Sequence, residues 1–149
     1  NEFSQEGTQS ISNEELKTLD VDVLIPAALG GSITKDNVDL IKANYIIELA
    51  NAPIDSSADE TLNQKGIIII PDILANAGGV IVSYFEWSQN LQQMYWTYDE
   101  AISKLEEKIL EAYNELVKYS NQNNVNLRVG AYALALQKIS LAQKARGLM

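Results

Sequence analysis

The sequence of 149 residues contains neither cysteine nor histidine. The absence of cysteine excludes disulfides and thiol chemistry, and it suits the reducing cytoplasm. The absence of histidine excludes Ser-His and Cys-His nucleophilic catalysis and most zinc sites. We therefore expect a cytoplasmic protein without a metal site.

Positive charge is also scarce, because 11 Lys and Arg face 20 Asp and Glu, for a formal net charge of -9. Binding to a nucleic-acid backbone needs clustered Lys and Arg, which argues against that role here. No apolar run reaches the ~18 residues needed to span a bilayer, and nothing resembles a signal peptide. We expect a protein that binds neither nucleic acid nor a membrane.

The glycine fingerprint of a complete dinucleotide-binding domain, G-x-G-x-x-G, is missing as well. The shorter stretches LGGS (29–32) and AGG (77–79) do not replace it. The amino end, NEFSQEGTQS (1–10), lacks an initiating Met and resembles no targeting segment. These features lead us to expect a processed protein or a fragment.

The composition is otherwise that of one globular domain, with 46% apolar and 21% charged residues. Short apolar runs predict strands over 21–28, 44–51 and 67–72. Polar, cappable segments between and before them predict helices over 12–20, 34–43 and 56–66. The alternation predicts an α/β protein with three parallel strands joined by right-handed crossovers. The run 21–28 is typical of a buried strand, and 67–72 is apolar enough for both sheet faces to be covered.

The rest of the sequence predicts helices. Residues 99–121 carry an apolar stripe at spacings of three and four, typical of a long solvent-facing helix. The stripe consists of Ile102, Leu105, Ile109, Tyr113 and Leu116. The segment 127–146 is apolar on more than one face and must be buried against something. We divide the single structural unit into residues 1–98 and a helical extension, 99–149.

Ligands of such sheets bind outside the carboxyl ends of the strands. Asn51, at one such end, can donate and accept hydrogen bonds, although asparagine is also simply common in turns. Asn76 lies at another end, just before Gly78-Gly79. The two glycines allow close approach of the backbone to a ligand, or they serve a loop with unusual dihedral angles.

Ser83 lies inside an apolar block that runs from Val80 to Trp87. The simplest role for its hydroxyl is a hydrogen bond to a carbonyl one turn earlier in a buried helix. Nearby aromatic residues favour a core or an interface over a stacking platform for bases, since no basic residues are interleaved. They are Tyr84, Phe85, Trp87, Tyr95 and Trp96.

Three motifs, taken together and in order, resemble one protein family. They are NEELKTLDVDVLIPAAL (13–29), ELAN (48–51) and PDILANAGGVIVSYFEWSQN (71–90). They resemble the carboxyl-terminal half of the glutamate dehydrogenases, in the glutamate, leucine, phenylalanine and valine dehydrogenase family, from about residue 11 to 147. The leucine, phenylalanine and valine enzymes share the architecture, but PAAL (26–29) with SYFEWSQN (83–90) fits the glutamate enzymes better.

The resemblance implies half of a Rossmann-like NAD(P)-binding domain plus carboxyl-terminal helices, which explains the missing fingerprint. It implies oxidative deamination of L-glutamate to 2-oxoglutarate and ammonia by hydride transfer to NAD or NADP. The catalytic residues would lie in an absent amino-terminal domain, so we expect none in this chain and no activity from it alone. The implied partners are the remainder of the dehydrogenase chain and further copies in a homo-oligomer.

The resemblance also assigns cofactor-binding residues. Ala27 and Ala28 would lie by the adenosine side of the cofactor. Asn51 would face the nicotinamide ribose, and Asn76 would sit between the nicotinamide and the substrate. The residue that usually decides between NAD and NADP lies at a strand end outside this chain.

On the substrate side, Val80 and Ser83 would line the pocket for the glutamate side chain, with the Ser83 hydroxyl bonded to the distal carboxylate. Leu49 and Ala52 depart from the family pattern EGANGP, since they replace its glycines. Leu49 adds bulk beside the strand end, and Ala52 is expected to strain a turn. These departures motivate a second hypothesis, a non-catalytic interaction or regulatory module with the same fold.

Overall fold

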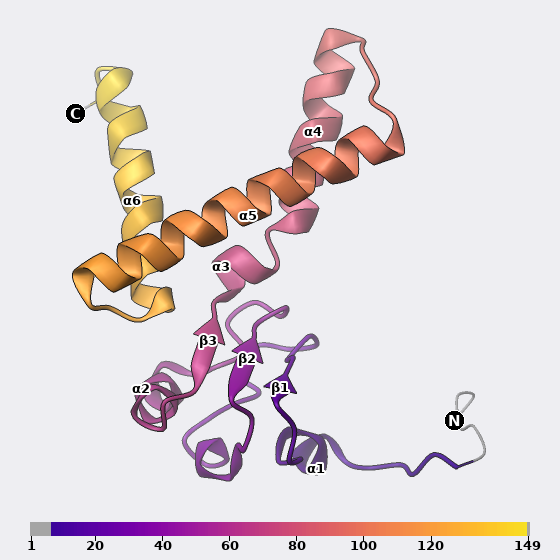
Figure 1. Ribbon diagram of the computed structural model, residues 1–149, viewed down its shortest axis with the longest axis vertical. Helices are drawn as coiled ribbons and strands as arrows, with labels where there is room; N and C mark the ends of the chain where they lie inside the picture. The colour runs from indigo at the N-terminus through magenta and orange to yellow at the C-terminus, as the bar shows by residue number, and fades with distance from the viewer. Residues whose placement is uncertain (1–6, 149) are drawn as a thin grey trace.

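The computed structural model describes residues 7–148 and contains one three-stranded sheet beneath a set of helices (Figure 1). The strands are β1 (Val23–Leu24), β2 (Tyr45–Ile47) and β3 (Ile68–Ile70), all parallel and in the order β1-β2-β3. The predicted α/β class and the three parallel strands are confirmed. Residues 1–6 of the unusual amino end lie outside the described residues.

The core lies on one side of this sheet, where the crossovers pack. A 3-10 helix, η1 (Val38–Leu40), lies between β1 and β2 in the chain, and α2 (Ser56–Gln64) lies between β2 and β3. Burial of apolar side chains between these elements is the main force that holds this layer together. The core cluster comprises Ile33, Val38, Ile41, Ala43, Ile46, Ile54, Ala58, Leu62, Ile67 and Ile69.

The predicted helix over 34–43 is wrong, because this segment forms turns followed only by η1. The side-chain oxygen of Asn37 accepts a hydrogen bond from the Thr34 amide at 2.9 Å, and the Thr34 hydroxyl oxygen accepts one from the Asp36 amide at 3.2 Å. Such local bonds satisfy the backbone outside a helix and compete with helical hydrogen bonds. Thr34 therefore closes a turn instead of capping a helix.

Two predictions about strand burial are also wrong: that 21–28 is a buried strand, and that both sheet faces are covered at 67–72. The register places Val23 beside Tyr45 and Tyr45 beside Ile68. All three side chains are exposed, by 42%, 45% and 45%, whereas their neighbours Ile46 and Ile69 are buried. The described residues thus cover one face of the sheet and leave this row on the other face open.

The two other predicted short helices are present and shorter. α1 (Asn13–Lys17) begins after Ser12, whose side chain accepts from the Glu15 amide in a capping box. α2 begins at Ser56, as predicted, with Asp55 at the N-cap position and no side-chain capping hydrogen bond. It is followed by Gly66 at φ 76°, the left-handed residue expected after a helix.

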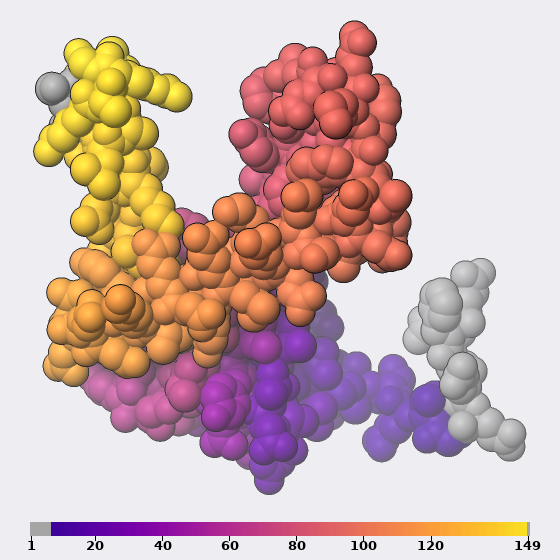
Figure 2. Space-filling view, turned by 45° about the horizontal axis from the view of Figure 1, so that its top comes forward, coloured from indigo at the N-terminus to yellow at the C-terminus, as the bar shows by residue number. Residues whose placement is uncertain are grey.

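The strands point toward a second layer made of helices (Figure 1). The short α3 (Asp72–Ala75) follows β3, and α5 (Tyr98–Asn123) runs across the top of the sheet layer. From the two ends of α5 project α4 (Gly78–Gln92) and α6 (Leu127–Ala145), with a wide notch between them (Figure 2). No helix within residues 7–148 combines the length and the apolar character needed to cross a bilayer.

The expectation that 127–146 is buried is not met within the described chain. Only Gly130 of α6 is buried, and Leu136, Ile139 and Leu141 are more than half exposed. The packing that exists is at the base of α6, where it crosses α5 and approaches β3. The apolar outer part of α6 therefore lacks a covering partner among residues 7–148.

Candidate functional site

The carboxyl ends of the three strands open onto one shallow cleft of about 500 Å³. Loops after β1 and β2 form one side, and the start of α4 forms the other. Every ligand residue predicted from the sequence lies in its wall. The lining consists of Ala27, Ala28, Leu49, Ala50, Asn51, Asn76, Gly79, Val80 and Ser83. The fold thus brings these residues together, while their binding roles stay predictions.

Asn51 and Asn76 bond to each other across the cleft. The Asn76 amide nitrogen donates to the side-chain oxygen of Asn51 at 2.7 Å and to the carbonyl oxygen of Leu49 at 3.3 Å. This arrangement fixes both side chains in the wall. It directs the Asn51 amide nitrogen and the Asn76 side-chain oxygen toward other partners, one donor and one acceptor for a polar ligand.

The loop that carries Asn51 is held in an unfavourable conformation. Ala52 has φ 43°, so the expectation of strain at this position is confirmed. The Ala52 amide donates to the Asp72 carboxylate at 2.8 Å, which stabilises the turn. A Cβ on Gly30 would lie 2.9 Å from the Asn51 carbonyl oxygen, so only glycine fits where the neighbouring loop touches this one.

Ser83 makes the hydrogen bond that its simplest role predicts. Its hydroxyl donates to the Gly79 carbonyl oxygen at 2.9 Å, one turn earlier in α4. The expectation of a buried helix is wrong here, because Ser83 and Val80 are exposed on the side of α4 that faces the cleft. Leu49 is half exposed at the same cleft, so its added bulk lies where a ligand would enter.

The chemistry available in the cleft is binding, not proton transfer. Its lining offers amides, one hydroxyl, small side chains and aliphatic surface, without a carboxylate, an amine or a guanidinium. A general acid or base needs a titratable side chain within hydrogen-bond reach of the reacting group. The cleft can therefore hold and orient a ligand, and any proton transfer must come from residues outside this lining.

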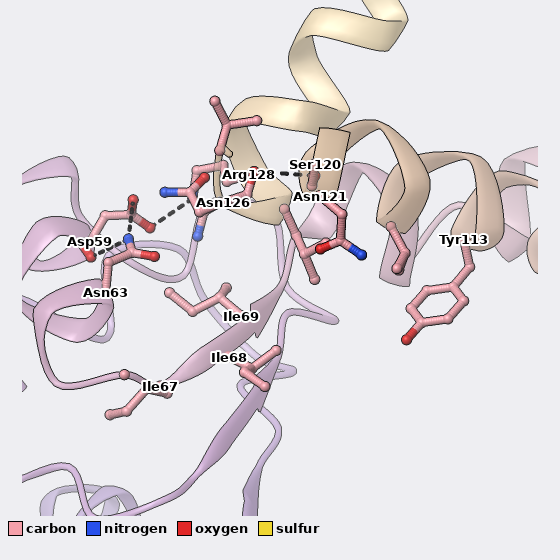
Figure 3. Close-up of a pocket in the computed structure, with 14 residues that line it drawn as sticks. Asp59, Asn63, Ile67, Ile68, Ile69, Tyr113, Ser120, Asn121, Asn126 and Arg128 are labelled. Carbon is pink, nitrogen blue, oxygen red and sulfur yellow. Dashed lines mark hydrogen bonds and ion pairs between the residues drawn. The ribbon is translucent and has the colours of Figure 1, made fainter. Parts of the chain in front are cut away.

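Beneath the cleft lies a buried ion cluster that the sequence reasoning missed. Glu48 is fully buried at the end of β2, and Arg128 of α6 donates to both of its oxygens at 2.8 Å. Arg128 also donates through Nε to Asp59 at 2.8 Å (Figure 3). Burial alone would lower the pKa of Arg128, but the hydrogen bonds that its guanidinium donates to Glu48 and Asp59 outweigh burial and raise that pKa. The available signal was a glutamate inside the apolar run YIIELA (45–50).

A second cavity, of about 430 Å³, lies beside this cluster and was also not predicted. Figure 3 shows Asp59 and Asn63 of α2 at one end and Tyr113 of α5 at the other, above Ile67 and the strand residues Ile68 and Ile69. It is separate from the cleft, with which it shares no lining residue.

Comparisons with known proteins agree on one family. A sequence profile described as Glutamate/Leucine/Phenylalanine/Valine dehydrogenase matches residues 1–147. The chain is 48% identical over 140 residues to a glutamate dehydrogenase of Thermotoga maritima, covering 94% of this chain and 34% of that protein. It is 50% identical over 139 residues to an NADP-specific glutamate dehydrogenase of Synechocystis sp., covering 93% and 32%.

The fold is similar to that of a solved enzyme of the same kind. The structure is that of a hetero-hexameric glutamate dehydrogenase from Thermus thermophilus in a leucine-bound form. The TM-score is 0.90 at 29% identity, and the match covers 96% of this chain and 34% of that one. The chain thus spans about a third of the length of the curated relatives it matches.

Proposed function

We propose that this chain, which belongs to the glutamate, leucine, phenylalanine and valine dehydrogenase family, forms one wall of the active site of a glutamate dehydrogenase. The complete protein would oxidise L-glutamate to 2-oxoglutarate and ammonia. Residues 1–98 would be the second half of the NAD(P)-binding domain and 99–149 the helical extension. The observation that carries the proposal is the convergence of Asn51, Asn76, Val80 and Ser83 on one cleft.

The lining of the cleft fits the nicotinamide end of NAD or NADP. A nicotinamide riboside offers hydroxyls and a carboxamide around a flat ring, which call for amide partners and small or apolar contacts. Asn51 and Asn76 supply the amides, and Ala27 and Ala28 supply small side chains. A Cβ on Gly79 would meet open space, so the start of α4 leaves room for close approach. When bound, the cofactor accepts the hydride.

The substrate side would be formed by the first turns of α4. Val80 offers an exposed aliphatic surface to the methylene groups of glutamate. The Ser83 hydroxyl would exchange its bond with the Gly79 carbonyl for one with the distal carboxylate, a stronger partner because it is charged. Leu49 lines the same cleft, and its side chain would narrow the space between these residues and the nicotinamide.

The remaining parts of the enzyme would come from outside this chain. The cleft lining contains no acid or base, so the groups that move protons would be supplied by the remainder of the dehydrogenase chain. Further copies would complete a homo-oligomer. A cytoplasmic location is part of the proposal, because the nicotinamide cofactors and amino acid substrates of such enzymes are found inside the cell.

Kinetics on the complete protein that carries these 149 residues test the proposal. We expect glutamate-dependent reduction of NAD or NADP, faster than with leucine, phenylalanine or valine, and no turnover by the 149-residue chain alone. Preference for an apolar amino acid would contradict the choice of glutamate and favour a related dehydrogenase. Turnover by the isolated chain would overturn the assignment of catalysis to other residues.

The gene upstream of Asn1 decides between this proposal and the non-catalytic module. The strained Ala52 and the intruding Leu49 favour the module, since both alter the wall that would hold the cofactor. An upstream sequence with a strand followed by G-x-G-x-x-G, and with a domain that carries the catalytic lysines, would exclude the non-catalytic module. An unrelated upstream domain would exclude the dehydrogenase.

A further inference from the structure

The ion cluster beneath the cleft joins parts of the chain that lie far apart in the sequence. Arg128 stands in the first turn of α6 and lies 2.8 Å from Glu48 at the end of β2. It lies equally close to Asp59 of α2, a contact that Figure 3 shows. The Glu48 side chain is 0% exposed and the Arg128 side chain only 19%. A carboxylate at that depth is tolerated only because the guanidinium fork satisfies both of its oxygens.

An attachment of α6 to the sheet does not require such a pair. Apolar side chains of similar volume hold two elements together as well as a buried ion pair or better, because no charge has to be desolvated. What Glu48 provides and an apolar side chain cannot is an acceptor. Its Oε2 accepts the backbone amide of Asp72 at 2.9 Å, at the first residue of α3.

Asp72 passes this constraint on to the cleft. Its carboxylate accepts the amide of Ala52 at 2.8 Å and that of Ile73 at 2.7 Å. Ala52 directly follows Asn51. Asn76 directly follows the short helix that Asp72 begins, and its backbone amide donates to the Asp72 carbonyl oxygen at 3.1 Å. Both members of the Asn51–Asn76 pair are therefore anchored to one residue, and that residue is anchored to Glu48.

We propose that Arg128 is a positioning residue for the cofactor-facing wall, acting through Glu48 and Asp72 on Asn51 and Asn76. This inference rests on the function proposed above. The contact between α6 and the sheet would then control the geometry of the cleft, although α6 contributes no residue to its lining. A loosened Arg128 would let Asp72 shift, and the two amides would lose their common support.

The test uses the complete protein with three single variants and one double variant. Arg128→Lys keeps the charge but loses the bidentate fork. Asp72→Ala removes the carboxylate that accepts the Ala52 amide. This amide is exposed, so it can bond to water instead. Lys138→Gln is the matched control, since it breaks a different ion pair of α6, with Glu115 of α5, and neither residue lines the cleft. The readouts are the Kd of NAD(P)H by fluorescence titration, KM, kcat and the thermal unfolding midpoint.

We expect Arg128→Lys and Asp72→Ala each to raise the Kd of NAD(P)H roughly tenfold, about the effect of one lost hydrogen bond to the ligand. The double variant, Arg128→Lys with Asp72→Ala, should bind NAD(P)H no more weakly than Asp72→Ala alone, because both changes act on one chain of contacts. Lys138→Gln should leave the Kd unchanged. KM for the cofactor should follow the Kd.

Two results would overturn the inference but leave the proposed function intact. The first is a lowered unfolding midpoint in Arg128→Lys with a wild-type Kd. The second is a double variant in which the fold-changes in Kd of the two substitutions multiply. If Arg128→Lys does not fold, Asp72→Ala decides, and wild-type affinity in that variant overturns the inference. A wild-type complete protein that binds neither NADH nor NADPH contradicts the proposed function itself, and the inference falls with it.

Discussion

Ala52 is a residue whose side chain opposes the backbone conformation it must adopt. Its φ of 43° lies in the left-handed region, where a Cβ costs roughly 1–2 kcal/mol. Ala52→Gly removes that cost and loses part of the gain to the greater freedom of glycine in the unfolded chain. We expect the free energy of unfolding to rise by about 1 kcal/mol, measured by urea denaturation of the 149-residue chain.

Ala50 supplies the control for this substitution. It lies two residues earlier, is buried, and is not among the residues with positive φ. Ala50→Gly should lower the free energy of unfolding by roughly 1 kcal/mol, since it adds only backbone freedom and a small cavity. Similar losses in the two variants would show that the turn at Ala52 is not strained.

Single residues of the cleft were predictable where the sequence fixes their place at a strand end. Asn51 and Asn76 follow two parallel strands, and such ends meet at one edge of a sheet whatever the side-chain details. The support beneath them was not predictable, because Arg128 contacts Glu48 across 80 positions of sequence. No local sequence pattern predicts the Arg128–Glu48 ion pair, because it depends on how the helical layer packs against the sheet.

At the scale of elements, the crossing of α5 and α6 depends on one glycine. A Cβ on Gly130 would lie 2.3 Å from the Ser120 hydroxyl oxygen and 3.0 Å from a Leu116 methyl carbon. Both side chains are buried, so Gly130→Ala should displace them or separate the helices. We expect a cost of roughly 1–3 kcal/mol, despite a gain of about 1 kcal/mol in helix propensity. Thermal unfolding of the 149-residue chain gives the measurement.

Gly79→Ala is the matched helical control. Gly79 stands in α4, and an added Cβ there meets nothing within 4 Å. This variant should gain up to about 1 kcal/mol from helix propensity alone. If Gly130→Ala were equally stabilising, the close crossing of α5 and α6 would be contradicted.

The start of α5 should weaken in acid. Thr97 and Glu100 form a capping box, in which the Glu100 carboxylate accepts the Thr97 amide at 2.7 Å. That backbone hydrogen bond, then the one from the Thr97 hydroxyl, lowers the pKa of Glu100 below its ordinary value of 4.5. Because the folded-state pKa is depressed, the stabilisation is complete above the ordinary value and is lost as the pH falls through the lowered pKa.

Amide hydrogen exchange in the first turn of α5 measures this effect. Between neutral pH and the acid range, protection should fall faster there than in the middle of α5, after correction for intrinsic exchange rates. Glu100→Gln keeps a neutral acceptor that does not titrate, so its first turn should show no such step. A step of the same size in Glu100→Gln would assign the effect to another group.

Helices and strands were predictable where the apolar periodicity was long and no local side-chain hydrogen bonds competed with the backbone. The apolar stripe predicted a helix over 99–121, and the structure has α5 over Tyr98–Asn123. The segment 34–43 is short and rich in Asp, Asn and Thr, whose side chains satisfied the backbone in turns. The open sheet face escaped prediction because the burial of a strand depends on what lies across from it, and residues 7–148 supply a cover on one side only.

At the scale of the whole molecule, α4 and α6 project from α5 (Figure 2). Many of their apolar side chains are exposed. Contiguous exposed apolar patches of this kind mark interfaces. The exposed apolar residues of α4 include Val80, Val82, Tyr84, Trp87 and Leu91, and those of α6 include Val129, Tyr132, Leu136, Ile139 and Leu141. In the proposed enzyme these surfaces would meet the remainder of the dehydrogenase chain.

The isolated 149-residue chain should therefore self-associate. Without the rest of the enzyme, the apolar outer faces of α4 and α6 can leave water only by meeting another copy. Light scattering after size exclusion should show a mass that rises with protein concentration. Leu136→Lys with Ile139→Lys, on the outer part of α6, should shift the chain toward the monomer mass, whereas Lys138→Gln between them should not. A strictly monomeric wild-type chain at high concentration would mean that these faces are satisfied within the chain, against the exposure of α6 found here.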